Sequence, residues 1–443
     1  MRSKERVAII GGGLSGSECA NILSRSGVGV DIYEMKPIRF SEAHKSELLA
    51  ELVCSNSLKS NDIYNPQGLL KEEMRRFGSL IIEAADRNSI PAGQSLSVDR
   101  ELFSRYITER LSRQKNIQII RKEVLNPLDL LRIYPAIVVA SGPLTSDFLA
   151  MNLKRMAGGD EFLYFYDAIS PIVTADSIDM GKAFLGSRYN KGGDDYINCP
   201  LNKEEYRVFY DAIINAEYVK SHIDESLKFF EGCLPLEEIA KRGFDSLTFG
   251  PFKPVGFGFE KSDMPYAVVQ LRAENREKTL YSMVAFQTRM KYGSQEKVIK
   301  LIPALKKCEI VRYGQMHRNI YMNSPLVLNK SIALKNYENI FITGTLSGVE
   351  GYIEAAASGI ITALSVYSYL NGINFVPPPD MTAMGLLYRY ITGEVSIGRR
   401  FVPTNINKGL FLHKGLKRYS DKIVDEAIRL IDEYLNIVPI VRV

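Results

Sequence analysis

The sequence has few of the residues that build metal sites and disulfide frameworks. Its 443 residues include four histidines and five cysteines. The cysteines lie far apart with no CxxC pair, which excludes a zinc ribbon and a disulfide-dense scaffold. The histidines are also unclustered, so we expect no metal site. In a reducing compartment the cysteines should be free thiols that are either buried or reactive.

Long hydrophobic runs are also missing. No apolar stretch approaches the roughly 20 residues that cross a membrane, and the runs at 7–10 and 136–140 have the length of buried strands. The N-terminus does not resemble a signal peptide. We therefore expect a cytoplasmic protein with no membrane contact. The net charge of +5 is mild, so it permits nucleic-acid binding without indicating it.

Apolar content and length predict a globular protein of two or three domains. Apolar residues make up 46% of the chain and charged residues 24%. The strand-like run at 7–10 has two counterparts, 136–140 and 340–343, each followed by glycine. Because these similar pieces lie far apart in sequence, we expect one doubly wound α/β domain assembled from both chain ends.

The middle of the chain has a different pattern. Glycine and proline turns separate short alternating segments there, which predicts an inserted α+β domain at 193–326. The doubly wound domain then comprises 1–192 and 327–443. Within it, the segment 375–408 is expected to be rich in loops, and an amphipathic helix is expected near 420–436.

A glycine-rich turn follows the first strand and opens a helix. Gly11, Gly13 and Gly16 have the GxGxxG spacing of dinucleotide-binding domains, and Glu34 ends the next strand. This spacing gives a tight turn, close backbone approach to a pyrophosphate, and close packing of helix on strand. The acidic residue binds a ribose hydroxyl. The predicted dinucleotide contacts are Gly11, Gly12, Gly13, Leu14, Ser15, Gly16 and Glu34.

Two features favour FAD over NAD as the dinucleotide. A second glycine-rich strand–helix junction occurs at 344–352, where two-part flavin domains place a helix start against the flavin. No second GxGxxG is present for a separate nicotinamide domain. We therefore predict a Rossmann-like FAD domain of the glutathione-reductase type, against the alternative of a glycine turn without ligand. The further predicted cofactor contacts are Gly344, Gly348, Val349, Glu350 and Tyr352.

Several longer segments have sequences unlike those of generic flavoproteins. They are 50–60 (AELVCSNSLKS), 166–173 (YDAISPIV), 232–237 (GCLPLE), 249–256 (FGPFKPVG), 284–288 (VAFQT), 312–319 (RYGQMHRN) and 348–352 (GVEGY). Together, from residue 7 to about 415, the sequence resembles the folate- and FAD-dependent tRNA (uracil-5-)-methyltransferases, the TrmFO family. This resemblance implies bound FAD, methylenetetrahydrofolate as carbon donor, and NADH or NADPH to reduce the flavin.

The resemblance also implies an RNA substrate. The usual target of the family is uridine 54 in the T-loop of tRNA, and one branch methylates a ribosomal RNA uridine instead. The sequence does not decide between them, and tRNA is the commoner case. The alternatives are a small-molecule flavin oxidoreductase and an RNA-binding protein that keeps FAD as a relic. A related larger family works with a GTPase, but its chains carry a long helical extension, so we expect no obligate protein partner.

C5 methylation of uracil needs a nucleophilic thiol, a base, a one-carbon carrier and a hydride source. A thiolate that adds to C6 makes C5 nucleophilic, and a base must then remove the C5 proton. We predict that Cys233 is the nucleophile and that Cys54 either removes the C5 proton or handles the methylene beside the flavin. The two cysteines could also exchange these roles. Without the resemblance, core packing would be the better explanation for either cysteine. Tyr352 is expected to stack on the folate pterin.

Basic residues of the inserted domain are candidates for the RNA surface. Each is also explained as a solvated charge, and His317 as a core histidine. A uridine inside a folded loop would have to be flipped out to reach both thiol and flavin. The candidate RNA-binding residues are Lys253, Arg272, Arg289, Lys291, His317 and Arg318.

Overall fold

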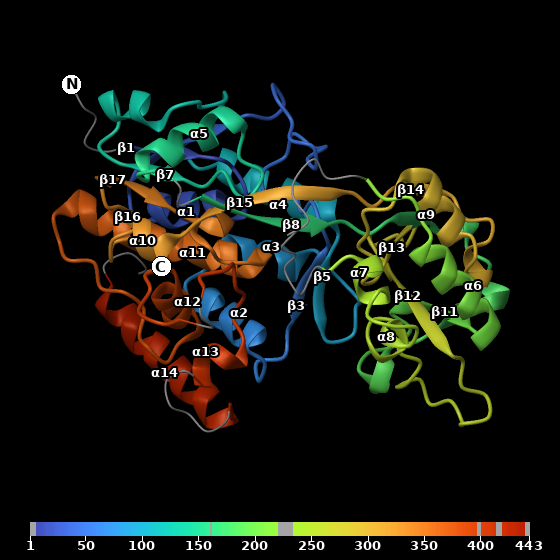
Figure 1. Ribbon diagram of the computed structural model, residues 1–443. Coiled ribbons are helices and arrows are strands. Elements are labelled where there is room, and N and C mark those ends of the chain that lie inside the picture. The colour runs from blue at the N-terminus through green and yellow to red at the C-terminus, as the bar shows by residue number, and fades with distance from the viewer. Residues whose placement is uncertain (1–5, 160–161, 220–233, 397–399, 413–418, 439–443) are drawn as a thin grey trace.

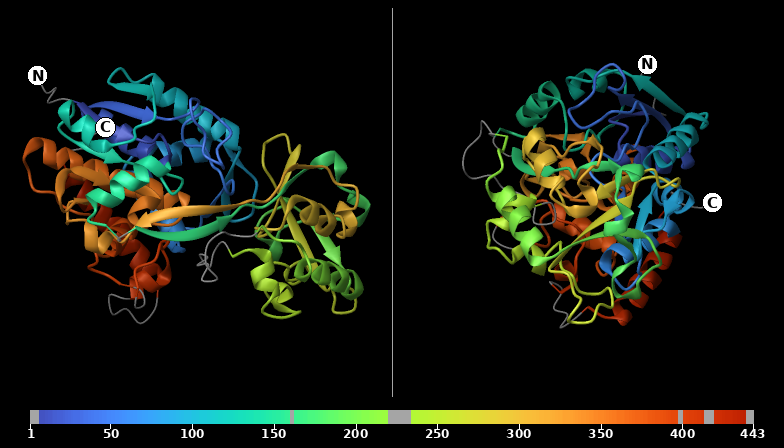
Figure 2. Two further views of the ribbon diagram at one scale, coloured as in Figure 1. Left: turned by 45° about the horizontal axis from the view of Figure 1, so that its top comes forward. Right: turned by 90° about the vertical axis from the view of Figure 1, so that its right-hand side faces the viewer.

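The protein forms a larger and a smaller lobe joined by a two-stranded ribbon (Figures 1 and 2). The computed structural model describes residues 6–159, 162–219, 234–396, 400–412 and 419–438. Each lobe has a separate hydrophobic core. The larger lobe contains both the first and the last elements of the chain, and the smaller lobe is built from its middle.

The larger lobe is organised around a six-stranded sheet with the order β16-β17-β7-β1-β2-β6. The five strands from β17 to β6 are parallel, and β16 is an antiparallel edge. The late strand β17 pairs directly with β7, which pairs with β1, so the prediction of one doubly wound domain built from both chain ends is confirmed. The bounds are β1 (Arg6–Ile10), β2 (Gly29–Glu34), β6 (Ile117–Arg121), β7 (Ile137–Val139), β16 (Ala333–Leu334) and β17 (Tyr337–Ile342).

Two glycines allow close backbone contacts in this lobe, one between α1 (Leu14–Arg25) and the turn before it and one between α1 and the late helix α11 (Tyr352–Asn371). A Cβ on Gly16 of α1 would lie 2.0 Å from the Gly11 carbonyl oxygen. A Cβ on Gly359 of α11 would lie 2.4 Å from the Ser15 carbonyl oxygen. The two helices therefore cross with their backbones in close contact. In the described part of the chain, α11 alone is long and apolar enough to cross a membrane, but 83% of its apolar window is buried inside the protein.

Further helices and a small sheet complete the larger lobe. The segment expected to be rich in loops contains α12, because Thr382 caps its N-terminus and the buried Glu73 carboxylate accepts hydrogen bonds from the Ala383 and Met384 N–H groups. The amphipathic helix near the C-terminus is confirmed as α14. The bounds are α2 (Pro66–Arg76), α3 (Leu80–Arg87), α4 (Arg100–Ser112), α5 (Asp147–Met156), α10 (Ser324–Val327), α12 (Ala383–Ile391), α13 (Lys408–Leu412), α14 (Asp421–Ile437), and the sheet β3 (Ser57–Ser60), β5 (Ser95–Val98), β4 (Ser89–Ile90).

The smaller lobe has a second six-stranded sheet with the order β10-β11-β12-β13-β9-β14. In chain order the first strand of this sheet is β9, which precedes the predicted domain boundary at residue 193. The glycine turn at residue 193 lies within the smaller lobe, because it connects the antiparallel strands β10 and β11. We therefore propose 169–315 for the inserted domain. The bounds are β9 (Ile172–Thr174), β10 (Phe184–Leu185), β11 (Tyr196–Leu201), β12 (Ala267–Ala273), β13 (Leu280–Met283), β14 (Ile310–Arg312), α6 (Lys203–Ile214), α7 (Leu236–Ala240), α8 (Ser246–Phe249) and α9 (Tyr292–Ile299).

The ribbon between the lobes consists of β8 (Phe162–Ala168) and β15 (Met316–Met322). These antiparallel strands run side by side from one lobe to the other (Figure 2). Met322 at the far end of β15 is fully buried in the core of the larger lobe. The segments that enter and leave the inserted domain are thus paired with each other, which places His317 at the junction of the lobes.

Candidate functional site

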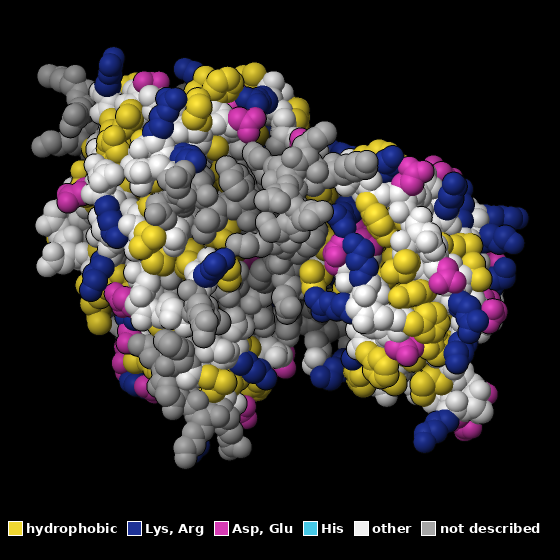
Figure 3. All heavy atoms as spheres, viewed as in Figure 1, with side chains coloured by type: hydrophobic (Ala, Val, Ile, Leu, Met, Phe, Trp, Pro, Cys, Tyr) yellow, Lys and Arg dark blue, Asp and Glu magenta, His cyan; other side chains and the backbone are white. Residues whose placement is uncertain are grey.

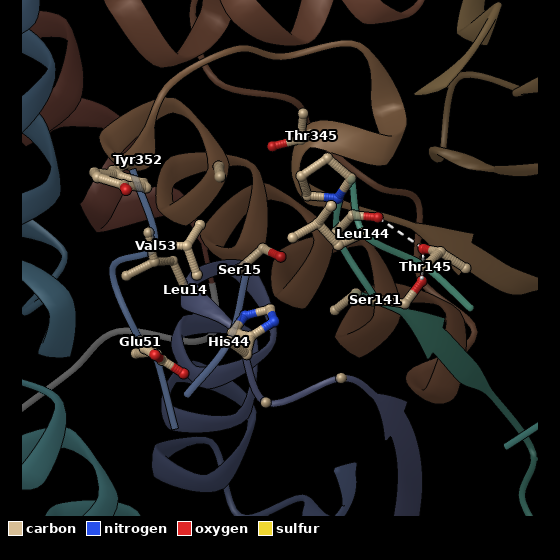
Figure 4. Close-up of a pocket in the computed structure, with 18 of the residues that line it drawn as sticks. Leu14, Ser15, His44, Glu51, Val53, Ser141, Leu144, Thr145, Thr345 and Tyr352 are labelled. Carbon is tan, nitrogen blue, oxygen red and sulfur yellow. Dashed lines mark hydrogen bonds between the residues drawn. The ribbon is translucent and has the colours of Figure 1, made fainter. Parts of the chain in front are cut away.

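A cavity of about 420 Å³ lies at the carboxyl ends of β1, β2 and β7 and at the start of α11. Figure 4 shows Tyr352 and Val53 on one side of it and Ser141 and Thr145 on the opposite side. Ligands of open parallel sheets bind at this edge, where the strand order reverses. Gln287 of the smaller lobe also lines the cavity, so both lobes contribute to one site.

The glycine turn forms one wall of the cavity and fits a pyrophosphate. Gly11 has φ +104°, and a Cβ there would lie 2.5 Å from the Ala140 carbonyl oxygen. A Cβ on Gly13 would meet nothing within 4 Å, because Gly13 borders the open cavity. Gly13 is also the N-cap of α1, and it offers no side chain to the first N–H groups of that helix. An uncapped helix start beside an open space is a ready site for an anion.

Glu34 lines the same wall at the end of β2. Its carboxylate accepts hydrogen bonds from the Gly12 N–H at 2.9 Å and the Lys36 N–H at 3.0 Å. A carboxylate has about four lone-pair positions, so these two bonds leave room for a ribose hydroxyl. The residues present therefore fit a bound dinucleotide. Five of the predicted contacts besides Glu34 line the cavity: Gly11, Gly12, Gly13, Leu14 and Ser15.

The late glycine junction contributes in two different ways. Glu350 and Tyr352, two of the predicted cofactor contacts, line the cavity. Gly344, Gly348 and Val349 do not line it and instead shape the turn that carries it. Cβ atoms on Gly344 and Gly348 would clash at 2.6 and 2.3 Å with the side chains of Ser15 and Phe401. Val349 is fully buried. Gly16 likewise does not line the cavity and instead lets α1 pack closely on the turn after β1. Cofactor contacts at these four residues stay predictions.

Cys54 lines the same cavity as the glycine turn, and Tyr352 holds its backbone. The Tyr352 hydroxyl accepts hydrogen bonds from the Cys54 N–H at 2.8 Å and the Ser55 N–H at 3.2 Å. The Cys54 Sγ lies 3.9 Å from the Ala168 carbonyl oxygen at the end of β8. Burial raises the pKa of Tyr352 well above its ordinary value, so the hydroxyl stays protonated at neutral pH. The structure thus gives Tyr352 a positioning contact that the sequence did not suggest.

Three arginines hold the Cys54 segment where the two lobes meet. Arg272 donates from Nε to the Asn56 Oδ1 and from Nη2 to the Ser55 Oγ, both at 2.8 Å. Arg312 donates to the Val53 carbonyl oxygen at 2.9 Å. Arg100 donates to the carbonyl oxygens of Leu52 and Cys54 and pairs with Glu274. We call Arg100, Arg272 and Arg312 the arginine clamp. Two of its members come from the smaller lobe, so the clamp ties the inserted domain to the cysteine segment.

His317, for which both an RNA contact and a core position were considered, lies inside the molecule. It is 5% exposed and lines the cavity, because alternation along β15 turns it toward the larger lobe. Among the described residues, neither ring nitrogen has a hydrogen-bond partner, and the Glu42 carboxylate is 3.8 Å from Nδ1. Burial lowers the pKa of His317 and of the neighbouring His44, so both rings are neutral at physiological pH.

The side chains of the other predicted RNA contacts differ in the partners that they already have within the protein. Arg272 is committed to the arginine clamp, and Arg289 pairs with Glu237 and Glu238 of α7. Lys291 is exposed and pairs with Glu217 at 2.9 Å. Lys253 packs over the ring of Tyr189. The structure describes the backbone of Arg318 but not its side chain.

The predicted nucleophile, Cys233, lies outside the described residues. The chain that follows it is anchored at the cavity, since the Leu236 N–H donates to the carbonyl oxygen of the cavity residue Gln287 at 2.7 Å. Cys19, Cys199 and Cys308 are buried free thiols, as expected for packing residues. Burial raises the pKa of Cys308 to about 11. Across the described ranges, no cluster of three metal-ligating side chains is found.

Sequence reasoning missed several residues of the site. His44, Glu51 and the segment 141–146 line the cavity, and Lys59 lies 3.7 Å from Glu350 and 3.6 Å from Glu354. The segment 141–146 had a usable signal, because it directly follows a buried parallel strand. Arg100 had no such signal, since a single arginine in a polar stretch does not indicate a functional role.

The fold and the cavity define a dinucleotide-dependent enzyme with a Rossmann-like FAD-binding lobe and a cysteine in the cofactor cavity. Residues 6–374 match the family described as Glucose inhibited division protein A. A relative in Syntrophus aciditrophicus, named Methylenetetrahydrofolate--tRNA-(uracil-5-)-methyltransferase TrmFO, is 49% identical over 93% of this chain and 92% of its own. A relative of the same name in Geobacter sulfurreducens is 48% identical over 97% of this chain and 98% of its own. The chain therefore belongs to the TrmFO family within this wider family, which confirms the resemblance noted from its sequence.

A solved structure supports the fold. GidA of Aquifex aeolicus superposes with a TM-score of 0.69 at 15% identity, over 97% of this chain and 73% of that chain. The similarity extends through both lobes. It confirms the fold class, a Rossmann-like FAD domain interrupted by an inserted α+β domain.

Proposed function

We propose that this protein methylates C5 of a uridine in tRNA, with methylenetetrahydrofolate as the carbon donor and FAD as the bound cofactor. Relatives at 46% to 49% identity over nearly the whole chain carry the corresponding name. The observation that carries the proposal is the shared cavity. The glycine turn that fits a pyrophosphate and the sulfur of Cys54 line one space of about 420 Å³.

The residues that would hold FAD are those of the first wall. The start of α1 would bind the pyrophosphate and Glu34 a ribose hydroxyl. Bound FAD, once reduced by NADH or NADPH, supplies the hydride that completes the methyl group. The part of the cavity lined by Tyr352 and Cys54 would then border the reacting end of the cofactor.

The two cysteines divide the remaining chemistry in this proposal. The Cys233 thiolate adds to C6 of uracil, and C5 then forms a bond to the folate-derived methylene carbon. Cys54 takes the C5 proton as the bond between the methylene carbon and the folate nitrogen breaks, which releases tetrahydrofolate and leaves an exocyclic methylene on C5. Addition of hydride to this methylene then restores the C5–C6 double bond and expels the Cys233 thiolate. The Tyr352 hydroxyl and the arginine clamp keep the Cys54 backbone fixed during these steps. Tyr352 also presents a ring that can stack on the pterin.

We further propose that the substrate is uridine 54 of the T-loop and that the base is extruded into the cavity. The enzyme would act in the cytoplasm without an obligate protein partner. A neutral, buried His317 beside the cavity suits a planar, uncharged heterocycle better than a phosphate.

Nucleoside analysis tests the proposal. The purified holoenzyme is incubated with unmodified tRNA transcript or, in a parallel reaction, with ribosomal RNA fragments. Each reaction contains methylenetetrahydrofolate labelled in its methylene group, and NADPH or NADH. We expect labelled 5-methyluridine in the T-loop, and none when folate is left out. Label in ribosomal RNA fragments but not in tRNA would redirect the target. NADPH oxidation without label in either RNA would favour a small-molecule flavin oxidoreductase.

A further inference from the structure

The segment 249–256 contains two phenylalanines that the fold treats in opposite ways. Phe252 is fully buried and packs against Phe209 and Phe286, with ring centroids 6.0 Å from each. Phe249, at the end of α8, is 85% exposed. Folding therefore uses Phe252 and leaves Phe249 in water, where a large apolar side chain contributes nothing to the core. An exposed aromatic in a tightly turned segment points to a partner outside the chain.

Basic and aromatic side chains surround this segment. The Lys253 Nζ lies 5.2 Å from the ring centroid of Tyr189, which is itself 54% exposed. The Arg188 Cζ lies 5.1 Å from the ring centroid of Phe257. Among the described residues, the Arg188 Nε and Nη2 are buried and have no hydrogen-bond partner, so the exposed positive charge of this set comes from Lys253. The set therefore offers ring faces, apolar surface and positive charge together. We call Arg188, Tyr189, Phe249, Lys253 and Val255 the aromatic platform.

The backbone holds part of this platform in a strained shape. Tyr189 has φ +60° and ψ +27°, a left-handed conformation that is uncommon for an aromatic residue. Its N–H donates to the Gly256 carbonyl oxygen at 2.6 Å. Gly256 has φ +100°, and a Cβ there would lie 3.1 Å from the Tyr189 ring. Strain of this kind is retained where the surrounding structure fixes a functional geometry.

The platform is on the part of the smaller lobe that continues from the cavity. Leu236 at the start of α7 is hydrogen bonded to the cavity residue Gln287, and α8 packs directly on α7. In Figure 3, hydrophobic side chains gather on the lower part of the smaller lobe, where Figure 1 labels α8, with Lys or Arg beside them. A long substrate with one unit in the cavity could thus continue over α7 onto this surface.

We infer that the aromatic platform binds the RNA substrate, with Phe249 and Tyr189 stacking on unpaired bases and Lys253 facing the backbone phosphates. Single-stranded nucleic acid is bound in this manner, by aromatic faces placed among basic residues. This inference rests on the proposed function and adds the surface by which the RNA is held. A neutral ligand would not need the lysine, and an acidic protein would not need two exposed ring faces.

The test measures RNA affinity by itself. The dissociation constant of an unmodified tRNA transcript is determined for the wild-type holoenzyme and for Phe249→Ala, Phe249→Leu, Phe249→Trp and Tyr189→Ala. Val208→Ala is the matched control, because Val208 on α6 of the same lobe is 50% exposed and lies outside the platform. Thermal unfolding and flavin content show that each variant is folded.

We expect Phe249→Ala and Phe249→Leu to weaken binding by about five- to hundredfold, the loss of one stacked base. Phe249→Trp should bind as tightly as the wild type, and Val208→Ala should change affinity by less than about twofold. If both Phe249→Ala and Tyr189→Ala bound tRNA with wild-type affinity, the inference that the platform binds RNA would be wrong, while the proposed function would still stand. Absence of 5-methyluridine from tRNA with the wild-type enzyme would overturn the proposed function, and the affinity comparison would still decide the platform.

Discussion

The two lobes present their functional residues in opposite ways. The larger lobe encloses its site, since the glycine turn, Glu34 and Cys54 line a cavity built into the sheet edge. The smaller lobe displays its side chains on an open surface, where Phe249 and Tyr189 are more than half exposed. An enclosed site needs a fixed geometry around a small rigid cofactor, whereas an open surface has to follow a large flexible polymer. Substitutions around the enclosed cavity should therefore slow the chemistry, whereas substitutions on the open surface should weaken RNA binding.

The largest effect on chemistry is expected from Cys54→Ala. Loss of the group that removes the C5 proton should lower methylation of tRNA by about 10²- to 10⁴-fold, while flavin content and tRNA affinity stay at wild-type levels. Single-turnover formation of 5-methyluridine is the measurement. Cys308→Ala is the matched control, because this buried thiol lies in the core of the smaller lobe and should cost about 1 kcal/mol of stability without loss of activity. Full activity of Cys54→Ala would remove this residue from the mechanism.

The enclosed site should also fail when its backbone is forced to move. Gly11→Ala places a methyl group 2.5 Å from the Ala140 carbonyl oxygen at φ +104°. We expect a loss of more than about 3 kcal/mol of folding free energy together with loss of bound flavin. Gly27→Ala is the control in the same βαβ unit, because Gly27 has φ +81° but open space around it. It should lose about 1 kcal/mol and keep the flavin. Denaturant unfolding and flavin absorbance measure both.

The contrast between the enclosed cavity and the open surface also explains how much of the site could be predicted from the sequence. The parallel sheet, the glycine turn and Glu34 follow from hydrophobic runs and a fixed spacing, since burial and turn geometry are local properties. The basic residues of the smaller lobe carry no such pattern. Arg272 and Lys253 have the same charge in sequence, yet one holds the Cys54 segment and the other packs over a tyrosine ring. Strand register and lobe packing decide this difference, and neither can be derived from residue type.

Arg272→Gln distinguishes these two roles of a basic residue. Without its guanidinium, the Cys54 segment loses two hydrogen bonds to Ser55 and Asn56. Methyl transfer should fall by about ten- to hundredfold through kcat, with tRNA affinity changed by less than about threefold. Lys291→Gln, on the open surface, should leave kcat unchanged and reduce the salt dependence of tRNA binding by about one ion at most. If Arg272→Gln lowered tRNA affinity and left kcat unchanged, Arg272 would be an RNA contact and not a positioning residue of the Cys54 segment.

Tyr352→Phe should have a smaller effect on the enclosed site. The ring remains, but the Cys54 and Ser55 N–H groups lose their common acceptor. An unsatisfied buried donor costs about 1–3 kcal/mol, so we expect about tenfold slower methylation and a lower unfolding midpoint. The Michaelis constant for folate should not change if the ring alone stacks on the pterin. A large increase in that constant with unchanged kcat would show that the hydroxyl contacts folate directly.

The smallest expected effect is on the pH dependence of stability, and it should differ between a buried lysine of the larger lobe and an exposed lysine of the smaller lobe. Lys71 is fully buried and donates to the carbonyl oxygens of Ser60 and Gln67, and burial lowers its pKa to about 7. Between about pH 8 and 9.5 the folded lysine is neutral while the unfolded one still binds a proton, so stability should rise with pH by up to about 1.4 kcal/mol per pH unit. Lys71→Met should lose this slope, whereas Lys291→Met should keep it. Urea unfolding at several pH values measures the slopes, and an equal slope in Lys71→Met would mean that Lys71 is charged in the folded protein.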